Sequence, residues 1–115
     1  MLLIEYPKCS TCRKAKAFLQ NHGAAFESRH IVDHPPTAAE LDAWQRRSGL
    51  PLSRFFNTSG QAYRRLGLKE ALPALDRQQQ LALLASDGML VKRPLLVGEG
   101  FVLVGFREAD WLERV

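Results

Sequence analysis

The hydrophobic positions in the first third of the chain follow a strand, then a helix, then a second strand. Leu2–Ile4 is a short apolar run, and Phe26–Val32 has the pattern of a second strand. Between them, Thr11–His22 repeats inward-facing positions at the spacing of one helical face, namely Ala15, Phe18, Leu19 and His22. Gly23 follows in the usual place for a left-handed helix cap. We expect a right-handed crossover that joins two parallel strands.

The middle of the chain, about residues 37–87, has the pattern of a helical insertion. Thr37–Glu40 has the spacing of a capping box, which predicts a helix that begins there and carries two inward apolar side chains, Leu41 and Trp44. A shorter helical piece is predicted over Leu52–Phe56, and Asn57–Gly60 offers cap residues for the segment that follows. Gln78–Ser86 predicts one more helix.

The last part of the chain returns to strands. Leu95–Val97 and Phe101–Val104 are apolar and are separated by Gly98–Gly100, which predicts an antiparallel hairpin. A final helix carries Trp111, Leu112 and Val115. The order of elements is βαβ, a helical insertion, then ββα. It predicts one α/β domain over residues 1–115 with a four-stranded mixed sheet.

Composition and charge bear on what this domain can bind and where it is located. The chain has 115 residues, 46% of them hydrophobic, and a formal net charge of +4. Its basic residues are scattered, so we expect no direct nucleic-acid binding. No apolar run approaches the roughly 20 residues of a membrane span, and the N-terminus lacks the pattern of a signal peptide. We therefore expect a cytoplasmic monomer.

A pair of cysteines, Cys9 and Cys12, lies between the first strand and the first helix. Disulfide exchange needs a reactive thiolate and a second thiol that closes onto the mixed disulfide. The start of a helix favours a thiolate at Cys9. Nearby basic side chains add positive potential: Lys8, Arg13 and Lys14. We interpret Cys9 as the nucleophile and Cys12 as the resolving thiol, with Ser10 and Thr11 able to donate to sulfur or cap the helix.

Other interpretations of the two cysteines are weaker. A structural disulfide across so short a loop would remove little entropy from the unfolded chain. A zinc site would need histidines to complete it, and Pro35 and Pro36 interrupt any helix that could align His30 with His34. Two inert packing cysteines remain an alternative to a redox pair. A Cys-x-x-Cys pair inside a βαβ unit favours the redox interpretation, and we predict no metal site.

Two arginines are predicted at the same edge of the sheet as the cysteines. Arg93 precedes the third strand and Arg107 follows the fourth. Two guanidinium groups over the Cys9 thiolate would make a pocket for an oxyanion, and we expect Ser10 and Thr11 to bind the oxyanion with them. The alternative is that both arginines are surface charges and that Pro94 only shapes a turn.

The motifs extend through nearly the whole chain: Tyr6-x-x-Cys9-Ser-x-Cys12-Arg-Lys-Ala15, Phe56-Asn-Thr-Ser-Gly60, Tyr63-x-x-Leu66-x-Leu68, Asp87-Gly-Met-Leu-Val-Lys-Arg-Pro94 and Gly105-Phe-Arg107. Together they resemble the arsenate reductase/Spx-related family of thioredoxin-like proteins, and most of all its uncharacterised arsenate reductase-like branch. The resemblance implies a thioredoxin-like fold. In such folds a cis-proline at the start of the third strand lies against the active cysteine, and Pro94 takes that position.

Resemblance to the glutathione- and glutaredoxin-dependent arsenate reductases implies an enzyme. Cys9 matches the cysteine that attacks arsenate, and Arg93 and Arg107 match two of the three arginines that bind the oxyanion. The third arginine is replaced by Asn57, with Arg54 one helical turn away. Those reductases generally lack a cysteine at position 12, so Cys12 implies an internal disulfide. The implied substrate is arsenate or an unknown disulfide or glutathione adduct. No bound cofactor is implied; glutathione is a candidate co-substrate, and glutaredoxin or thioredoxin the electron donor.

Resemblance to the Spx regulators implies an alternative function. Those proteins share the Cys-x-x-Cys pair and the Arg-Pro dipeptide, here Arg93 and Pro94. They bind the C-terminal domain of the RNA polymerase α subunit and use the disulfide as a switch. The Gly105–Arg107 segment resembles the reductases more closely.

Overall fold

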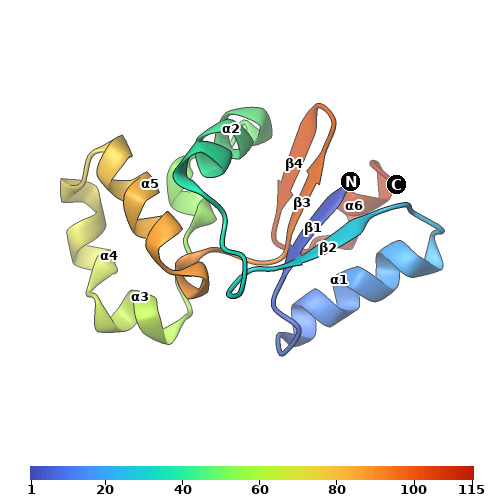
Figure 1. Cartoon of the computed structure of the whole chain (residues 1–115), viewed down its shortest axis with the longest axis horizontal. Helices are drawn as coiled ribbons and strands as arrows, with labels where there is room; N and C mark the ends of the chain where they lie inside the picture. Colours follow the sequence, from blue (N-terminus) through green and yellow to red (C-terminus); the bar gives the residue numbers. More distant parts are fainter.

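A four-stranded mixed sheet lies at the centre of the computed structural model, which describes residues 1–115 (Figure 1). Strands β1 (Leu2–Glu5), β2 (Glu27–His30), β3 (Leu95–Gly98) and β4 (Phe101–Val104) lie in the order β2-β1-β3-β4. β1 pairs in parallel with β2 and antiparallel with β3, and β3 pairs antiparallel with β4. The predicted α/β fold with a mixed four-stranded sheet is confirmed.

The second strand is shorter than the sequence predicted. Pairing with β1 ends at His30, because β1 itself ends at Glu5 and the chain then turns away. The Ile31 N–H still donates to the Glu5 carbonyl at 2.8 Å, and the His34 N–H donates to the His30 carbonyl at 2.9 Å, which closes a turn.

Helices α1 (Ser10–Asn21) and α6 (Glu108–Leu112) cover one face of the sheet. Because side chains alternate along a strand, Leu3 and Leu96 point to this face. They form a buried cluster with helical side chains from α1 and α6: Ala15, Phe18, Leu19 and Trp111. The predicted inward face of α1 is therefore correct up to Leu19.

The prediction of an inward His22 is wrong. His22 caps the C-terminus of α1 and is exposed, and its Nδ1 lies 2.8 Å from the Phe18 carbonyl oxygen. The helix ends at this residue because Gly23 takes the left-handed conformation, with φ of 66°.

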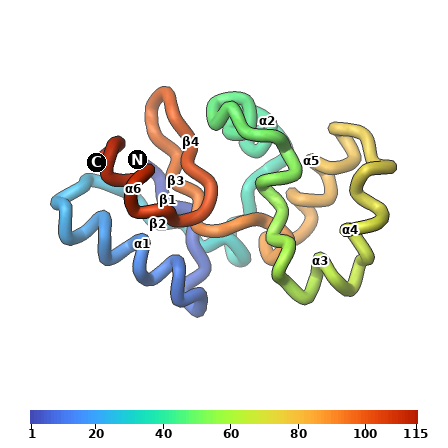
Figure 2. The backbone as a smooth tube through the Cα atoms, turned by 180° about the vertical axis from the view of Figure 1, so that it is seen from behind, coloured from blue at the N-terminus to red at the C-terminus, as the bar shows by residue number.

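The other face of the sheet packs against the insertion. A larger core cluster joins strand residues, including Ile4 and Leu95, to insertion residues, including Phe55 and Leu84. Figures 1 and 2 show the insertion as a helical lobe beside the sheet. None of the helices has the length and apolarity that a membrane crossing requires. The lobe consists of α2 (Ala38–Ser48), a 3-10 turn (Leu52–Phe55), α3 (Gln61–Arg65), α4 (Leu68–Ala71), a 3-10 turn (Leu72–Ala74), α5 (Arg77–Ser86) and a 3-10 turn (Gly88–Leu90).

The predicted capping box at the start of α2 is confirmed and also anchors the lobe. The Glu40 N–H donates to the Thr37 hydroxyl oxygen at 3.1 Å, and the Thr37 N–H donates to the Glu40 carboxylate at 3.0 Å. Arg29 of β2 forks onto both oxygens of the same carboxylate, at 2.7 and 2.9 Å. One acidic side chain thus satisfies a helix end and ties the insertion to the sheet.

The prediction of cap residues over Asn57–Gly60 is correct only for Gly60, which is the N-cap residue of α3. Helix α3 begins after Gly60 without a side-chain cap. Asn57 is instead buried, with 8% exposed, and its Oδ1 accepts a hydrogen bond from the Ser59 hydroxyl at 3.2 Å. Its N–H donates to the Leu90 carbonyl at 2.8 Å, and the Lys92 N–H donates to the Phe55 carbonyl at 2.7 Å. These bonds hold the Asn57 loop against the segment that leads into β3.

Candidate active site

Cys9 lies at the mouth of α1, where it is the N-cap residue. Its own N–H donates to the Tyr6 carbonyl at 2.9 Å, which closes the loop after β1. Backbone N–H groups of Thr11 and Cys12 point at its sulfur, because the first turn of a helix leaves these donors free. We expected the hydroxyls of Ser10 and Thr11 to donate or cap. No side-chain cap forms, both residues are exposed, and the Thr11 contribution comes from its backbone.

Cys12 is the buried member of the pair, with no exposed surface. Its sulfur accepts a hydrogen bond from the Tyr6 N–H at 3.4 Å. Both cysteines are free thiols. Burial and the neighbouring Cys9 raise the pKa of Cys12 to about 12, against the opposing effects of the Tyr6 N–H and the Arg93 charge.

The pKa of Cys9 moves the opposite way. Burial on its own would raise it, but hydrogen bonds from the Cys12 N–H and thiol, the Thr11 N–H and the Arg93 guanidinium outweigh burial, so the pKa of Cys9 is lowered. The side chains of Lys8, Arg13 and Lys14, expected to favour the thiolate, are exposed, and they do not appear among the groups that set this pKa. Contacts at the sulfur therefore matter more than the surrounding surface charge.

Arg93 is held over the loop between β1 and α1. Its guanidinium stacks over the Tyr6 ring at 5.2 Å from the centroid. Its Nε and Nη1 atoms are buried and have no hydrogen-bond partner, which leaves donors available for a ligand. Pro94 follows through a cis peptide bond and is buried at the start of β3. Tyr6, whose ring positions Arg93, was not singled out by the sequence as a site residue.

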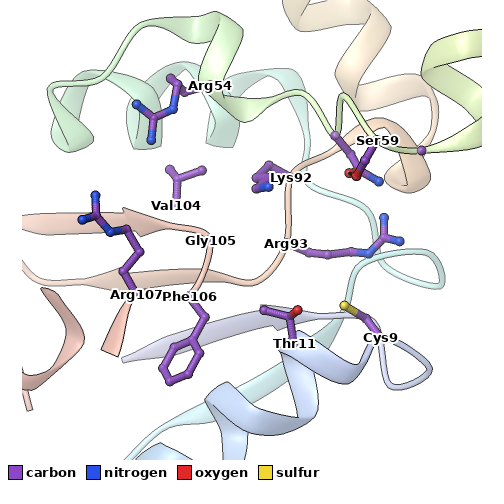
Figure 3. A pocket seen from close by; sticks show the side chains of 12 residues that line it. Cys9, Thr11, Arg54, Ser59, Lys92, Arg93, Val104, Gly105, Phe106 and Arg107 are labelled. Atoms are coloured by element: carbon purple, nitrogen blue, oxygen red, sulfur yellow. Dashed lines mark hydrogen bonds between the residues drawn. The ribbon is translucent and has the colours of Figure 1, made fainter. Parts of the chain in front are cut away.

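A cavity of about 430 Å³ opens beside Cys9. Figure 3 shows Cys9, Thr11 and Arg93 at one end, Lys92 in the middle, and Arg54 and Arg107 at the other end across Val104. Asn57 and Ser59 complete its polar wall. Four basic side chains thus line one cavity, and Lys92 was missed by the sequence analysis because only the tertiary structure turns it to this side.

Arg107 does not lie over the Cys9 thiolate as expected. It is the N-cap residue of α6, its side chain is 78% exposed, and its Nε lies 3.7 Å from the Asp110 carboxylate. Its guanidinium points toward the Arg54 end of the cavity (Figure 3). Gly105, with φ of 74°, turns the chain away after β4 and carries Arg107 to that end.

Comparison with known proteins identifies the family. The family model described as the ArsC family matches residues 4–114. The chain belongs to the ArsC family. This confirms the predicted membership of the arsenate reductase/Spx-related, thioredoxin-like proteins.

Relatives of this ArsC family chain carry different names. It is 53% identical over 109 residues to the uncharacterized protein YusI of Bacillus subtilis, covering 95% of this chain and 92% of the relative. It is 31% identical over 110 residues to the global transcriptional regulator Spx of Enterococcus faecalis, covering 96% and 82%. The crystal structure of a possible arsenate reductase from Streptococcus mutans is 50% identical with a TM-score of 0.88, covering 96% and 95%.

Proposed function

We propose that this ArsC family protein is a thiol-dependent reductase in which Cys9 is the nucleophile and Cys12 the resolving thiol. The observation that carries the proposal is the asymmetry of the pair. The pKa of Cys9 is lowered at the edge of a cavity, whereas Cys12 is fully buried and its pKa is raised to about 12. A dithiol reductase needs one thiol that attacks the substrate and a second that stays protonated until the mixed disulfide has formed.

The reaction proceeds in two balanced exchanges for a disulfide substrate. The Cys9 thiolate attacks one substrate sulfur, a Cys9–substrate disulfide forms, and the other half leaves as a thiolate. Cys12 then attacks the Cys9 sulfur, which forms the Cys9–Cys12 disulfide and releases the second half. The two protein thiols supply two electrons, and a dithiol donor such as glutaredoxin or thioredoxin returns them.

The order of these steps follows from charge. The Cys9 thiolate is one of the groups that raise the pKa of Cys12, after burial. When Cys9 enters a mixed disulfide it loses its negative charge, and that repulsion disappears. Cys12 therefore becomes easier to deprotonate only after the substrate has bound covalently.

The cavity supports an anionic substrate with some length. Its volume of about 430 Å³ falls in the range of roughly 300–1,000 Å³ that accommodates small-molecule ligands. Arg93 stands at the sulfur, whereas Arg54 and Arg107 stand at the far end (Figure 3). A glutathione adduct, with carboxylates remote from its sulfur, uses both ends. Arsenate, a compact oxyanion, uses the Arg93 end alone, and Asn57 offers no positive charge there.

Substrate reduction by purified protein tests the proposal. Wild type is supplied in turn with arsenate and with a glutathione mixed disulfide, each with glutathione plus glutaredoxin or with thioredoxin. We expect turnover of the glutathione adduct that Cys9→Ser abolishes. Unchanged reduction in Cys9→Ser would refute the nucleophile assignment, and turnover of arsenate alone would refute the substrate preference.

A charge test separates the two ends of the cavity. Arg107→Gln, alone and with Arg54→Gln, is assayed with an acidic and a neutral disulfide of equal length. We expect kcat/KM for the acidic disulfide to fall by about tenfold or more, since a hydrogen bond to a charged group contributes about 1.5–3 kcal/mol. The neutral disulfide should react as before. Equal losses of kcat/KM for the acidic and the neutral disulfide would show that these arginines do not bind the substrate carboxylate.

A second candidate function is a redox-switched regulator that binds RNA polymerase through its α subunit. The similarity to the Spx regulator of Enterococcus faecalis over nearly the whole chain favours it, together with Cys12, which allows an internal disulfide. A binding assay tests it, in which wild type and Cys12→Ser, each reduced and oxidised, are used to capture the isolated C-terminal domain of the polymerase α chain. Absence of binding in both redox states excludes this function.

A further inference from the structure

A second cavity, of about 350 Å³, adjoins the cavity beside Cys9. Ser59, Gly60 and Arg93 line both cavities, whereas Cys9 lines only the first. In Figure 3 the Arg93 side chain extends away from Arg107, and its guanidinium lies on the side of Cys9 and Ser59. A ligand that is bonded to Cys9 can therefore extend past Arg93 into the second cavity.

Two opposite charges line the second cavity without pairing. Arg65 is the last residue of α3 and Asp87 follows the end of α5. Neither takes part in an ion pair, with the other or with a third side chain. One Asp87 oxygen accepts a hydrogen bond from the Met89 N–H at 2.9 Å, which leaves the other oxygen free. A cation and an anion held apart in one cavity match a ligand that carries both charges.

Arg93 adds hydrogen-bond donors between the two cavities. Its Nε and Nη1 atoms are buried and have no partner. Buried donors without a partner cost free energy, which an acceptor on a ligand restores. An amide carbonyl between the sulfur and the charged end of the ligand would supply that acceptor.

The position of Cys9 sets how far the charged end lies from the sulfur. Cys9 does not line the second cavity, so a ligand reaches that cavity only if a spacer separates its sulfur from its charged end. In cysteine the ammonium and carboxylate sit on the carbon next to the one that bears the sulfur. In glutathione the γ-glutamyl group adds an amide and places a second α-ammonium and α-carboxylate about two residues of extended chain further on, roughly 7 Å.

We propose that the second cavity binds the γ-glutamyl end of a glutathione half bonded to Cys9, an inference that rests on the reductase function proposed above. Asp87 pairs with the α-ammonium, Arg65 with the α-carboxylate, and Arg93 donates to the amide carbonyl between them and the sulfur. The Cys9 thiolate bonds to the cysteinyl sulfur of this half, and the other half of the disulfide leaves as a thiolate that takes up a proton from solvent. The glycine carboxylate is left to extend the opposite way, toward Arg54 and Arg107.

Substrate discrimination tests this site on the full chain. Reduced protein is mixed with glutathione disulfide, with the same disulfide acetylated on both amino groups, or with cystine. Samples are quenched with an alkylating agent, and mass spectrometry follows the loss of the two free protein thiols. Asp87→Asn is compared with wild type and with Asp76→Asn. Both aspartates cap a helical turn, Asp76 by accepting the Gln79 N–H at 2.8 Å, but of the two only Asp87 lines the cavity.

We expect wild type to react about tenfold faster with glutathione disulfide than with its acetylated form, because acetylation removes the charge that pairs with a carboxylate. Asp87→Asn keeps the oxygen that accepts the Met89 N–H but removes the charge. It should abolish this preference and leave the rate with the acetylated disulfide unchanged, and Asp76→Asn should match wild type with both. Equal wild-type rates with the two disulfides, or equal losses in Asp87→Asn, would overturn the proposed site.

Cystine separates the two sources of an α-amino-acid group. Its charged groups lie too close to the sulfur to reach the second cavity, so Asp87→Asn should react with cystine at the wild-type rate. A loss confined to cystine would overturn the assignment to the γ-glutamyl end.

A second variant covers the case in which Asp87→Asn does not fold. Arg65 is exposed, and Arg65→Gln should slow the reaction with both glutathione disulfides about threefold, since both retain the α-carboxylate. The rate with cystine should not change, and unchanged rates with all three disulfides would contradict the role of Arg65. Failure of the reductase function looks different: wild type would react with none of the three disulfides, or Cys9→Ser would react as wild type does.

Discussion

Removal of the Arg93 guanidinium tests what sets the reactivity of Cys9. Arg93 donates a hydrogen bond to the Cys9 sulfur and is held in place by the Tyr6 ring, 5.2 Å away. Arg93→Gln keeps a polar side chain but removes the charge. The thiolate of Cys9 is then stabilised by one donor fewer, while burial still destabilises it. The pKa of Cys9 should therefore rise.

The size of the effect follows from one charge-assisted hydrogen bond. Such a bond contributes about 1.5–3 kcal/mol, and the lower end applies at this partly exposed residue. Since about 1.4 kcal/mol is a factor of ten, the thiolate fraction below the pKa should fall about tenfold. A more basic thiolate is also a better nucleophile. With a Brønsted coefficient of about 0.4–0.5, its rate constant for attack should rise about threefold, which offsets part of the loss. The net attack should be about threefold slower below the pKa and about threefold faster well above it.

The assay is the reaction of reduced protein with 4,4′-dithiodipyridine, a neutral disulfide whose thiopyridone product absorbs light. The first thiopyridone release, which reports attack by Cys9, is measured across pH. The neutral disulfide removes any direct effect of charge on substrate binding. Arg13→Gln is the matched control, because its guanidinium donates to the Pro7 carbonyl at 3.3 Å rather than to the sulfur. The rate–pH curves of Arg93→Gln and wild type should cross, whereas the Arg13→Gln curve should overlie wild type. A curve for Arg93→Gln that is lower at every pH, or unshifted, would refute the assignment.

Three further predictions concern the resolving thiol, the anchor of the insertion and the core. Cys12→Ser should accumulate a mixed disulfide on Cys9 that mass spectrometry detects as one added substrate half; loss of that half at the wild-type rate would contradict the resolving role. Arg29 lowers the pKa of Glu40 to about 2, so this stabilisation is present above the ordinary value near 4.5 and is lost as pH falls toward 2. Over that window wild type should lose about 1–2 kcal/mol of unfolding free energy relative to Glu40→Gln in urea titrations, after allowance for solvent screening; parallel pH profiles would contradict this. Trp111→Ala should lower the unfolding free energy by about 3–5 kcal/mol, since Trp111 is fully buried, and a loss below about 1 kcal/mol would show that the α6 contact is dispensable.

Much of the secondary structure could be predicted because its signals are local. The capping box of Thr37 and Glu40 involves groups three residues apart, and the structure contains both of its hydrogen bonds. Gly49 ends the same helix with φ of 71°, a conformation that glycine adopts without steric cost. The hairpin of β3 and β4 also follows from two apolar runs around a glycine-rich turn. The error at His22 has a local cause, because its ring lies against Phe18 of the same helix. The Asn57 loop is instead held by a backbone hydrogen bond to Leu90, which is distant in the chain.

The candidate site was predicted only in part. The order of residues was enough to establish that Cys9 precedes a helix and that Cys12 lies within its first turn, since strand, loop and helix are contiguous there. Helix geometry then implies that the two sulfurs belong to one reactive unit. The motifs were likewise enough to indicate the family, because they extend through most of the chain.

The division of charged side chains around the two thiols became visible only in the folded chain. In the folded chain Arg93 lies at the Cys9 sulfur and Arg107 lies at the other end of the cavity, although the same role was predicted for both from the sequence. Folding also buried the Glu5 carboxylate at the end of an otherwise apolar strand, next to Lys16 of α1. The cause is that pKa and reactivity depend on burial and on charges a few ångströms away. Those neighbours come from strands and helices that are distant in the chain and meet only when it folds.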